Sequence, residues 1–178
     1  MVTTTPTRKE DVKDPIGVIG WPNEKGRDGE RTPMQWNASK DAGFSTAAAT
    51  WLPVPPDYTT INVQAEEADP NSLLDWYKKL IELRRTNPAL RDGEPQMLDP
   101  TNPNVLSYLR KGPPGSPSVV VSLNFTAQPQ TVSLDLAGTG IAGVNIMTLM
   151  TDDASLQSTK SLTHIVLPPF ASWVASVQ

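Results

Sequence analysis

The spacing of apolar side chains changes along the 178 residues and divides the chain into stretches of different character. From Pro15 to about Ile61, the apolar residues follow neither the two-residue period of a strand nor the 3.6-residue period of a helix. Glycine and proline interrupt this stretch repeatedly. Yet it holds large side chains that favour burial, namely Trp21, Met34, Trp36, Phe44 and Trp51. Two interpretations stay open: a long loop over a surface outside this sequence, or an arm packed on the chain's own C-terminal half.

A helix is expected from about residue 70 to residue 86. Asp69 is a suitable N-cap, Pro70 fits the first helical position, and Asn87-Pro88 ends the helix. Between them, side chains at three- and four-residue spacing form one stripe, made of Leu73, Trp76, Tyr77, Leu80, Ile81 and Arg84. Trp76 and Tyr77 are expected in a core rather than in a platform for a ligand.

Beyond Gly93 the apolar period becomes two, which predicts strands separated by glycine- and proline-containing breaks. The expected strands are Val105–Arg110, Val119–Asn124, Thr131–Leu136, Val144–Met150, Leu162–Leu167 and Phe170–Val177. Short strands at this spacing, with no helix between them, indicate an antiparallel β-sandwich with a core of its own.

Composition and charge exclude several functional classes. The chain is 38% hydrophobic with a net charge of −4, its basic residues are scattered, and no apolar run is long enough to cross a bilayer. We therefore expect neither a nucleic-acid nor a membrane partner. With no Cys and one His, metal sites built on thiolates or several histidines are excluded, so no metal and no cofactor is expected. The residues after Met1 lack the basic and apolar regions of a secretory leader, so none is expected. The compartment stays open, with the cytoplasm slightly favoured.

Three short patterns are interpreted as structural. Gly138–Gly143 fits the dinucleotide-binding spacing G-x-G-x-x-G, but the residues that follow indicate a strand where that site needs a helix, so we expect a hairpin turn. His164 has no second histidine beside it and is expected as a partly exposed residue of a strand. Asp152-Asp153 lacks the remaining ligands of a calcium loop and is expected as a polar turn.

The loop between Gly26 and Ser45 holds the most informative chemistry. Arg27 and Arg31 carry planar guanidinium groups, which can pair with adjacent sugar hydroxyls or with a carboxylate that itself holds a sugar. Trp36 offers an indole that can stack on the apolar face of a pyranose. On these residues alone, an ion-paired and packed loop is still the simpler interpretation.

The stretch Arg31–Trp36, with Ala42-Gly43-Phe44, closely resembles a signature of α-glucosidases of the α-amylase superfamily (glycoside hydrolase family 13). These include oligo-1,6-glucosidases, maltases and relatives that form trehalulose or trehalose. Further pieces resemble the C-terminal third of the family, in the family's order, namely Thr3–Asp14, Ile61–Val63, Asp69–Leu74, Tyr77–Ile81, Leu83-Arg84, Tyr108–Arg110 and Leu167–Phe170.

The resemblance implies a mixed fold. Residues 1–92 would be the incomplete C-terminal end of a (β/α)₈ barrel, with an active-site loop at 1–68 and the last barrel helix at about 70–86. Residues 93–178 would be the all-β antiparallel sandwich that follows the barrel. The loop would then form a wall of the active site at the C-terminal face of the barrel, where such enzymes keep their chemistry.

The resemblance also implies a function that this sequence holds only in part. Retaining glycosidases need a nucleophilic and an acidic carboxyl group about 5 Å apart. In the family these groups come from earlier barrel strands, and no carboxylate here lies in a matching context. We therefore assign no catalytic residue, expect the chain alone to be inactive, and leave open whether it is an enzyme.

The resemblance implies that this chain contributes to binding an α-glucoside oligosaccharide of the malto or isomalto type. Only Arg31 carries over a role: it matches the family arginine that grips the glucose of the deepest subsite. Arg27 and Trp36 remain candidates through their own chemistry. Gln35 and Trp36 match the signature and are expected mostly to shape the loop, while Asn37 stands where aspartate is common. Without a barrel, the apolar loop and helix invite self-association. The alternative is a free-standing, non-catalytic β-sandwich module that binds carbohydrate or protein.

Overall fold

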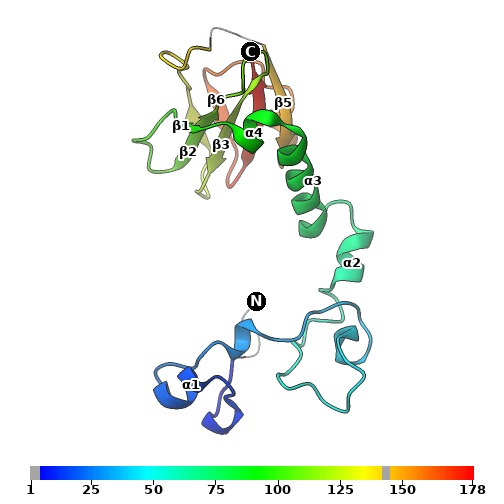
Figure 1. Cartoon of the computed structure of the whole chain (residues 1–178). Helices are drawn as coiled ribbons and strands as arrows, with labels where there is room; N and C mark the ends of the chain where they lie inside the picture. Colours follow the sequence, from blue (N-terminus) through cyan, green and yellow to red (C-terminus); the bar gives the residue numbers. More distant parts are fainter. Residues whose placement is uncertain (1–4, 142–144) are drawn as a thin grey trace. The chain divides into compact units, whose positions relative to one another are not determined.

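The computed structural model describes residues 5–141 and 145–178 (Figure 1). The chain forms two compact units, one up to Lys79 and the other from Leu80 to Gln178. The boundary falls inside helix α3 (Leu73–Thr86).

The first unit consists of loops joined by short helical turns. Its α-helices are α1 (Pro15–Gly20), α2 (Val63–Ala68) and the beginning of α3, and its 3₁₀ turns are η1 (Lys9–Asp11), η2 (Asp28–Glu30) and η3 (Lys40–Gly43). The apolar period indicates neither α1 nor α2, because each has only six residues. Both begin at a side-chain cap: Asp14 accepts the N–H of Ile16, and Asn62 accepts the N–H of Ala65.

Helix α3 begins at Leu73, so the predicted start at Pro70 is wrong. The N-cap is Ser72, whose Oγ accepts the N–H of Asp75 at 3.1 Å. The Asp69 carboxylate accepts the N–H two residues further on, at 2.8 Å, which closes a turn ahead of the helix. The end of α3 at Thr86 agrees with the predicted stop.

The apolar stripe of α3 is not a core in this chain. No residue of α3 is buried; Trp76 is half-buried and Tyr77 is 58% exposed. The prediction of a core position for these two rings is therefore wrong for the chain as described. The spacing of the stripe is helical, but Leu73, Tyr77 and Ile81 of the stripe are all exposed.

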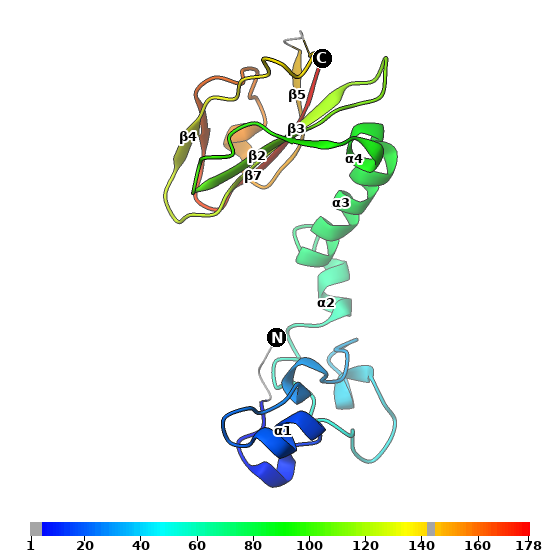
Figure 2. The same cartoon turned by 60° about the vertical axis from the view of Figure 1, so that its left-hand side comes forward.

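The second unit contains two antiparallel sheets. The larger has the strand order β1 (Pro95–Met97), β2 (Val105–Arg110), β3 (Ser118–Asn124), β7 (Ser172–Val177) and β5 (Ile146–Thr151), and the smaller pairs β4 (Gln130–Val132) with β6 (Ile165–Leu167). Figures 1 and 2 show β2, β3 and β7 side by side. The predicted antiparallel, strand-rich half is thus confirmed, although β4 and β6 are shorter than expected and β1 was not predicted.

One hydrophobic core joins both sheets. Leu109, Val120 and Trp173 of the larger sheet contribute to the same buried cluster as Val132 and Leu167 of the smaller one. The strand side chains alternate, because successive residues point to opposite faces. On the other face, Val119, Val121 and Val174 pack with Ala89 of helix α4 (Pro88–Asp92), which lies against the sheet in Figure 1.

Trp173 occupies the centre of this core. Its side chain is fully buried, and its indole N–H donates to Thr148 Oγ1 at 2.9 Å. Ser122 is its partner in the strand register, and Ser107 is the partner of Ser122. The two buried hydroxyls lie 3.0 Å apart and satisfy each other. Small residues in this row leave space for the large indole.

The structure also tests the three short patterns. His164 is exposed but precedes β6 with a left-handed φ of 57°, so its predicted strand position is wrong. Asp152-Asp153 forms the predicted polar turn, in which Asp153 caps a short 3₁₀ turn. Residues 137–140 form a turn, whereas the end of the Gly138–Gly143 pattern and the first residue of the strand expected from Val144 lie outside the described residues.

Within residues 5–141 and 145–178, no helix combines the length and the apolar character needed to span a bilayer. The same residues contain no group of three or more histidines and acidic residues that could hold a metal ion.

We predict that Trp173→Ala destabilises the second unit by about 3–5 kcal/mol, because it removes a fully buried aromatic side chain and leaves a cavity. Urea unfolding followed by far-UV circular dichroism measures the effect. Phe125→Ala is the matched control, since Phe125 is 64% exposed and its truncation should change stability by no more than about 0.5 kcal/mol. Equal stability of the two variants would contradict the placement of Trp173.

Candidate functional site

Two buried carboxylates join the start of α1 to the segment that precedes Arg31. Asp14 accepts the Nε–H of Arg27 at 2.7 Å, its Nη2–H at 3.3 Å and its backbone N–H at 3.0 Å. Asp28 accepts the backbone N–H groups of Lys13 at 2.6 Å and of Asp14 at 3.2 Å. Each segment therefore donates to a carboxylate of the other. We call Asp14, Arg27 and Asp28 the carboxylate clasp.

The clasp places Asp14 in an unusual electrostatic setting. The residue is 2% exposed, whereas the side chain of Arg27 is about half exposed. The hydrogen bond from the Arg27 side chain is the main cause that holds the pKa of Asp14 far below its ordinary value of 3.8. Burial opposes this shift, and the backbone N–H groups of Ile16 and Arg27 reinforce it. Asp14 is therefore a charged structural group rather than a general acid.

Two glycines allow the clasped segments to approach closely. A Cβ on Gly17 would lie 2.4 Å from the carbonyl oxygen of Lys25. A Cβ on Gly26 would lie 2.8 Å from the Cβ of Asp14, and Gly26 also has a left-handed φ of 73°. The clasp thus depends on backbone positions that only glycine fits.

Arg31 lies one 3₁₀ turn after the clasp. Its backbone N–H donates to the carbonyl oxygen of Asp28 at 3.1 Å and closes η2. The residue is exposed, and its side chain has no hydrogen bond or ion pair within the described residues. The fold therefore fixes the backbone at Arg31 and leaves the five N–H groups of its guanidinium available.

The next signature residues hold the loop. The Gln35 amide donates to the carbonyl oxygen of Ile61 at 2.7 Å and to the carboxylate of Asp57 at 3.2 Å, so it shapes the loop as expected. Trp36 is held through its backbone, whose N–H donates to the Ala42 carbonyl oxygen at 2.9 Å. The residue as a whole is 49% exposed.

The Ala42-Gly43 part of the signature forms a left-handed turn. Asp41, Ala42 and Gly43 have φ values of 53°, 57° and 68°. The side chain of Asn37 lies against Gly43, where a Cβ would come within 2.6 Å of its amide nitrogen. The Asn37 oxygen accepts the N–H and the hydroxyl of Ser39, so the uncharged residue still organises this turn.

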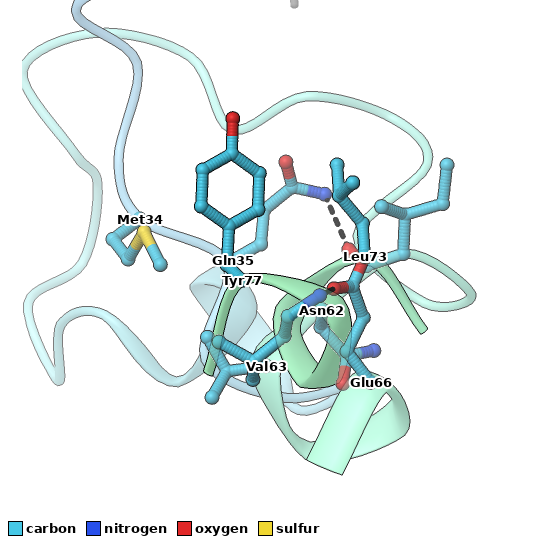
Figure 3. A pocket seen from close by; sticks show the side chains of 9 residues that line it. Met34, Gln35, Asn62, Val63, Glu66, Leu73 and Tyr77 are labelled. Atoms are coloured by element: carbon cyan, nitrogen blue, oxygen red, sulfur yellow. Dashed lines mark hydrogen bonds between the residues drawn. The ribbon is translucent and has the colours of Figure 1, made fainter. Parts of the chain in front are cut away.

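A largely apolar pocket of about 300 Å³ lies beside this loop (Figure 3). It is lined by Met34, Gln35, Ile61, Asn62, Val63, Glu66, Leu73, Leu74 and Tyr77. None of the predicted binding residues Arg27, Arg31 and Trp36 lines it. The pocket therefore marks uncovered apolar surface rather than the site that the signature predicts.

The three predicted binding residues differ in what their side chains contact. The guanidinium of Arg27 pairs with Asp14, that of Arg31 has no partner within the described residues, and Trp36 is half exposed. The prediction did not include Asp14 or Asp28. Asp14-Pro15 is a helix-start signal of the same kind as Asp69-Pro70, and could have identified the first of them.

The signature, its loop and the antiparallel sheets can be compared with known proteins. The pattern of the family described as "Alpha amylase, catalytic domain" matches residues 2–93, about half of the chain. The chain belongs to the alpha-amylase family. This confirms the resemblance drawn from Arg31–Trp36.

Individual members of the alpha-amylase family are similar over most of the chain. The probable alpha-glucosidase of Rhizobium meliloti is 38% identical over 71% of this chain and 22% of its own length. The oligo-1,6-glucosidase of Parageobacillus thermoglucosidasius is 41% identical over 64% of this chain and 20% of its own length. The chain thus spans about a fifth of the length of these relatives. The crystal structure of a trehalulose synthase from Pseudomonas mesoacidophila superposes with a TM-score of 0.79 and 29% identity, over 99% of this chain and 34% of that one.

We predict that Asp14→Asn removes an acid-dependent part of the stability of the first unit. The pKa of Asp14 is lowered on folding, so its stabilising effect is complete above the unfolded value near 3.8 and is lost as the pH falls below it. The difference in unfolding free energy between the wild type and Asp14→Asn should therefore be constant from about pH 5 to 7 and shrink below about pH 4. Urea unfolding followed by tryptophan emission measures it, because Trp21, Trp36, Trp51 and Trp76 all lie in this unit. A difference independent of pH would contradict the role of the carboxylate.

Proposed function

We propose that the chain provides the sugar-binding wall of an α-glucosidase-type glycoside hydrolase that acts on malto- or isomalto-oligosaccharides. The observation that carries the proposal is the pairing of a fixed backbone with an available guanidinium at Arg31, inside the signature of the family. Such a group can donate two parallel hydrogen bonds to neighbouring sugar hydroxyls, or to a carboxylate that holds the sugar. Arg27 and Trp36 were predicted for the same ligand; Trp36 would add a stacking face.

The catalytic carboxylates would belong to other parts of such an enzyme. The two buried carboxylates close to Arg31 in sequence, Asp14 and Asp28, both accept backbone N–H groups of the clasp. Neither is placed as a nucleophile or a general acid. The proposal therefore assigns binding, and not bond cleavage, to this chain.

We further propose that residues 1–92 form the end of a (β/α)₈ barrel and that residues 93–178 form the β-sandwich that follows it. The match to the catalytic domain ends at residue 93, which supports this division. The antiparallel sheets and the core that joins them support the sandwich.

A second candidate function is a free-standing binding module for carbohydrate or protein. The observation in its favour is that the second unit has its own hydrophobic core. Calorimetric titration of the whole chain with maltooligosaccharides separates the two functions. Tight binding that Arg31→Ala does not weaken would favour the module.

We predict that Arg31→Ala lowers the activity of an enzyme that contains this chain. The chain would replace the matching segment of the Parageobacillus thermoglucosidasius oligo-1,6-glucosidase, and glucose release from isomaltose would be measured. Loss of charge-assisted hydrogen bonds worth about 1.5–3 kcal/mol should reduce kcat/KM about 10- to 150-fold. Arg31→Lys keeps the charge but loses the planar fork of donors. Its kcat/KM should therefore lie between that of the wild-type hybrid enzyme and that of Arg31→Ala.

Two controls accompany this experiment. Arg85→Ala removes an exposed ion pair with Glu82 and should leave kcat/KM unchanged. The 178-residue chain alone should release no glucose. Full activity of the Arg31→Ala enzyme, or turnover by the chain alone, would reject the proposed function.

We also propose that the isolated chain self-associates through the first unit. This unit exposes many large apolar side chains, namely Ile16, Val18, Ile19, Met34, Trp36, Phe44, Trp51, Ile61, Leu73 and Tyr77. Several of them line one pocket (Figure 3), and contiguous apolar surface of this kind favours association. The occupant we propose is a second copy of the chain.

We predict that sedimentation velocity detects dimers or larger species of the wild-type chain, and that Ile61→Lys shifts the distribution to monomer. Ile61 is 54% exposed, so a lysine there should disturb association without disturbing folding. Phe125→Lys, at an exposed position of the second unit, should leave the distribution unchanged. A wild-type chain that sediments as a monomer at all concentrations would contradict self-association.

A further inference from the structure

We propose that Arg27 is a positioning residue: through the carboxylate clasp it fixes the turn that presents Arg31, and it does not itself hold the sugar. This inference rests on the proposed function, in which Arg31 binds the substrate.

The guanidinium of Arg27 is already paired with a buried carboxylate. Its Nε–H and Nη2–H donate to the two oxygens of Asp14, at 2.7 and 3.3 Å. The Asp14 side chain has no exposed surface, so removing its guanidinium partner would leave a buried charge without compensation. A sugar hydroxyl would have to compete with this ion pair for the same fork. Arg27 is therefore engaged in the structure, whereas Arg31 is available.

The carboxylate clasp is connected directly to the turn that holds Arg31. Arg27 is the residue that precedes η2, and its carbonyl oxygen accepts the N–H of Glu30 at 3.1 Å. The carbonyl oxygen of Asp28 accepts the N–H of Arg31, also at 3.1 Å. Two residues of the clasp thus hold both backbone hydrogen bonds of the turn. A change in the clasp moves the backbone from which the Arg31 side chain extends.

A second arginine–aspartate pair in the same unit serves as a matched control. Arg8 donates to both oxygens of Asp11 through Nε and Nη2, each at 2.8 Å, which is the same fork geometry. Both side chains are largely exposed, and the pair spans three residues within one turn. Exposed pairs of this kind contribute little. Arg8→Gln therefore removes an arginine–aspartate fork without affecting the clasp.

Backbone hydrogen exchange on the 178-residue chain tests the structural step. Arg27→Gln should accelerate exchange in a peptic peptide over residues 26–34 by about tenfold or more, because the N–H groups of Glu30 and Arg31 lose their fixed acceptors. Arg8→Gln should leave this peptide unchanged. Arg27→Lys, which keeps a charge beside Asp14, should lie between them and serves where Arg27→Gln unfolds the first unit. Unchanged exchange in both Arg27 variants would overturn the inference.

Kinetics in the hybrid enzyme described above test the functional step. Arg27→Gln should lower kcat/KM by about tenfold, since small misplacement of a positioning group is costly. In the Arg31→Ala background, the same change should have less than about a twofold effect, because there is no side chain left to position. A purely structural loss would lower the amount of active enzyme equally in both backgrounds. An undiminished effect of Arg27→Gln without Arg31 would overturn the inference.

The two proposals fail in different ways. If Arg31→Ala leaves kcat/KM unchanged, the proposed function fails, and the role of Arg27 fails with it. If Arg31→Ala lowers kcat/KM but Arg27→Gln does not, the proposed function stands and the positioning role is rejected.

Discussion

The geometry of the first unit depends on pairing between buried carboxylates and the donors around them. Among its described residues the buried apolar side chains are few and scattered, namely Val12, Pro33, Ala42, Leu52 and Pro55, so hydrophobic burial supplies little of its order. Asp14 and Asp28 take over this role, because each accepts hydrogen bonds from the other's segment. A buried carboxylate without donors is strongly unfavourable, so these contacts specify the path of the backbone as well as stabilise it.

The second unit is instead held together mainly by buried apolar side chains. Its sheets share a core of aliphatic side chains around Trp173, and its buried hydroxyls at Ser107 and Ser122 satisfy each other. Burial of these apolar side chains is the main favourable contribution to the order of this unit. The first unit instead exposes residues such as Trp51 and Tyr77, which are 74% and 58% exposed. This apolar surface is the physical reason to expect a covering partner, whether a barrel or a second copy of the chain.

The sequence predicts those parts of the fold that local patterns specify. Alternation over Val105–Arg110 gives the bounds of β2, because this strand has one face in each buried cluster. The start of α3 was misplaced because Asp69-Pro70 is as good a helix-start signal as Ser72. The Ser72 hydroxyl decides between them: it accepts the N–H of Asp75 and also donates to the carbonyl oxygen of Glu66, a contact that the local sequence does not reveal. The burial of Tyr77 could not be judged from spacing, which identifies an apolar stripe but not the surface that covers it.

The candidate site shows the same limit at the level of single residues. Arg31, Gln35 and Trp36 could be found because they lie together in one signature, whereas Asp14 lies 13 residues from Arg27. The structure then divides the signature by physical role. Gln35 fixes the backbone through its side-chain amide, and Gly43 does so by adopting a left-handed conformation that its lack of a side chain allows. Arg31 is the one signature residue whose charged side chain has no partner within the described residues.

This division explains how a loop with little regular secondary structure can carry a precise recognition group. A binding arginine contributes only if its backbone is ordered before the ligand arrives, because ordering it on binding would subtract from affinity. The clasp, the η2 turn and the Gln35 bridge provide that order with polar contacts. The apolar side chains of the same loop are thereby free to face outward, toward whatever surface completes the site.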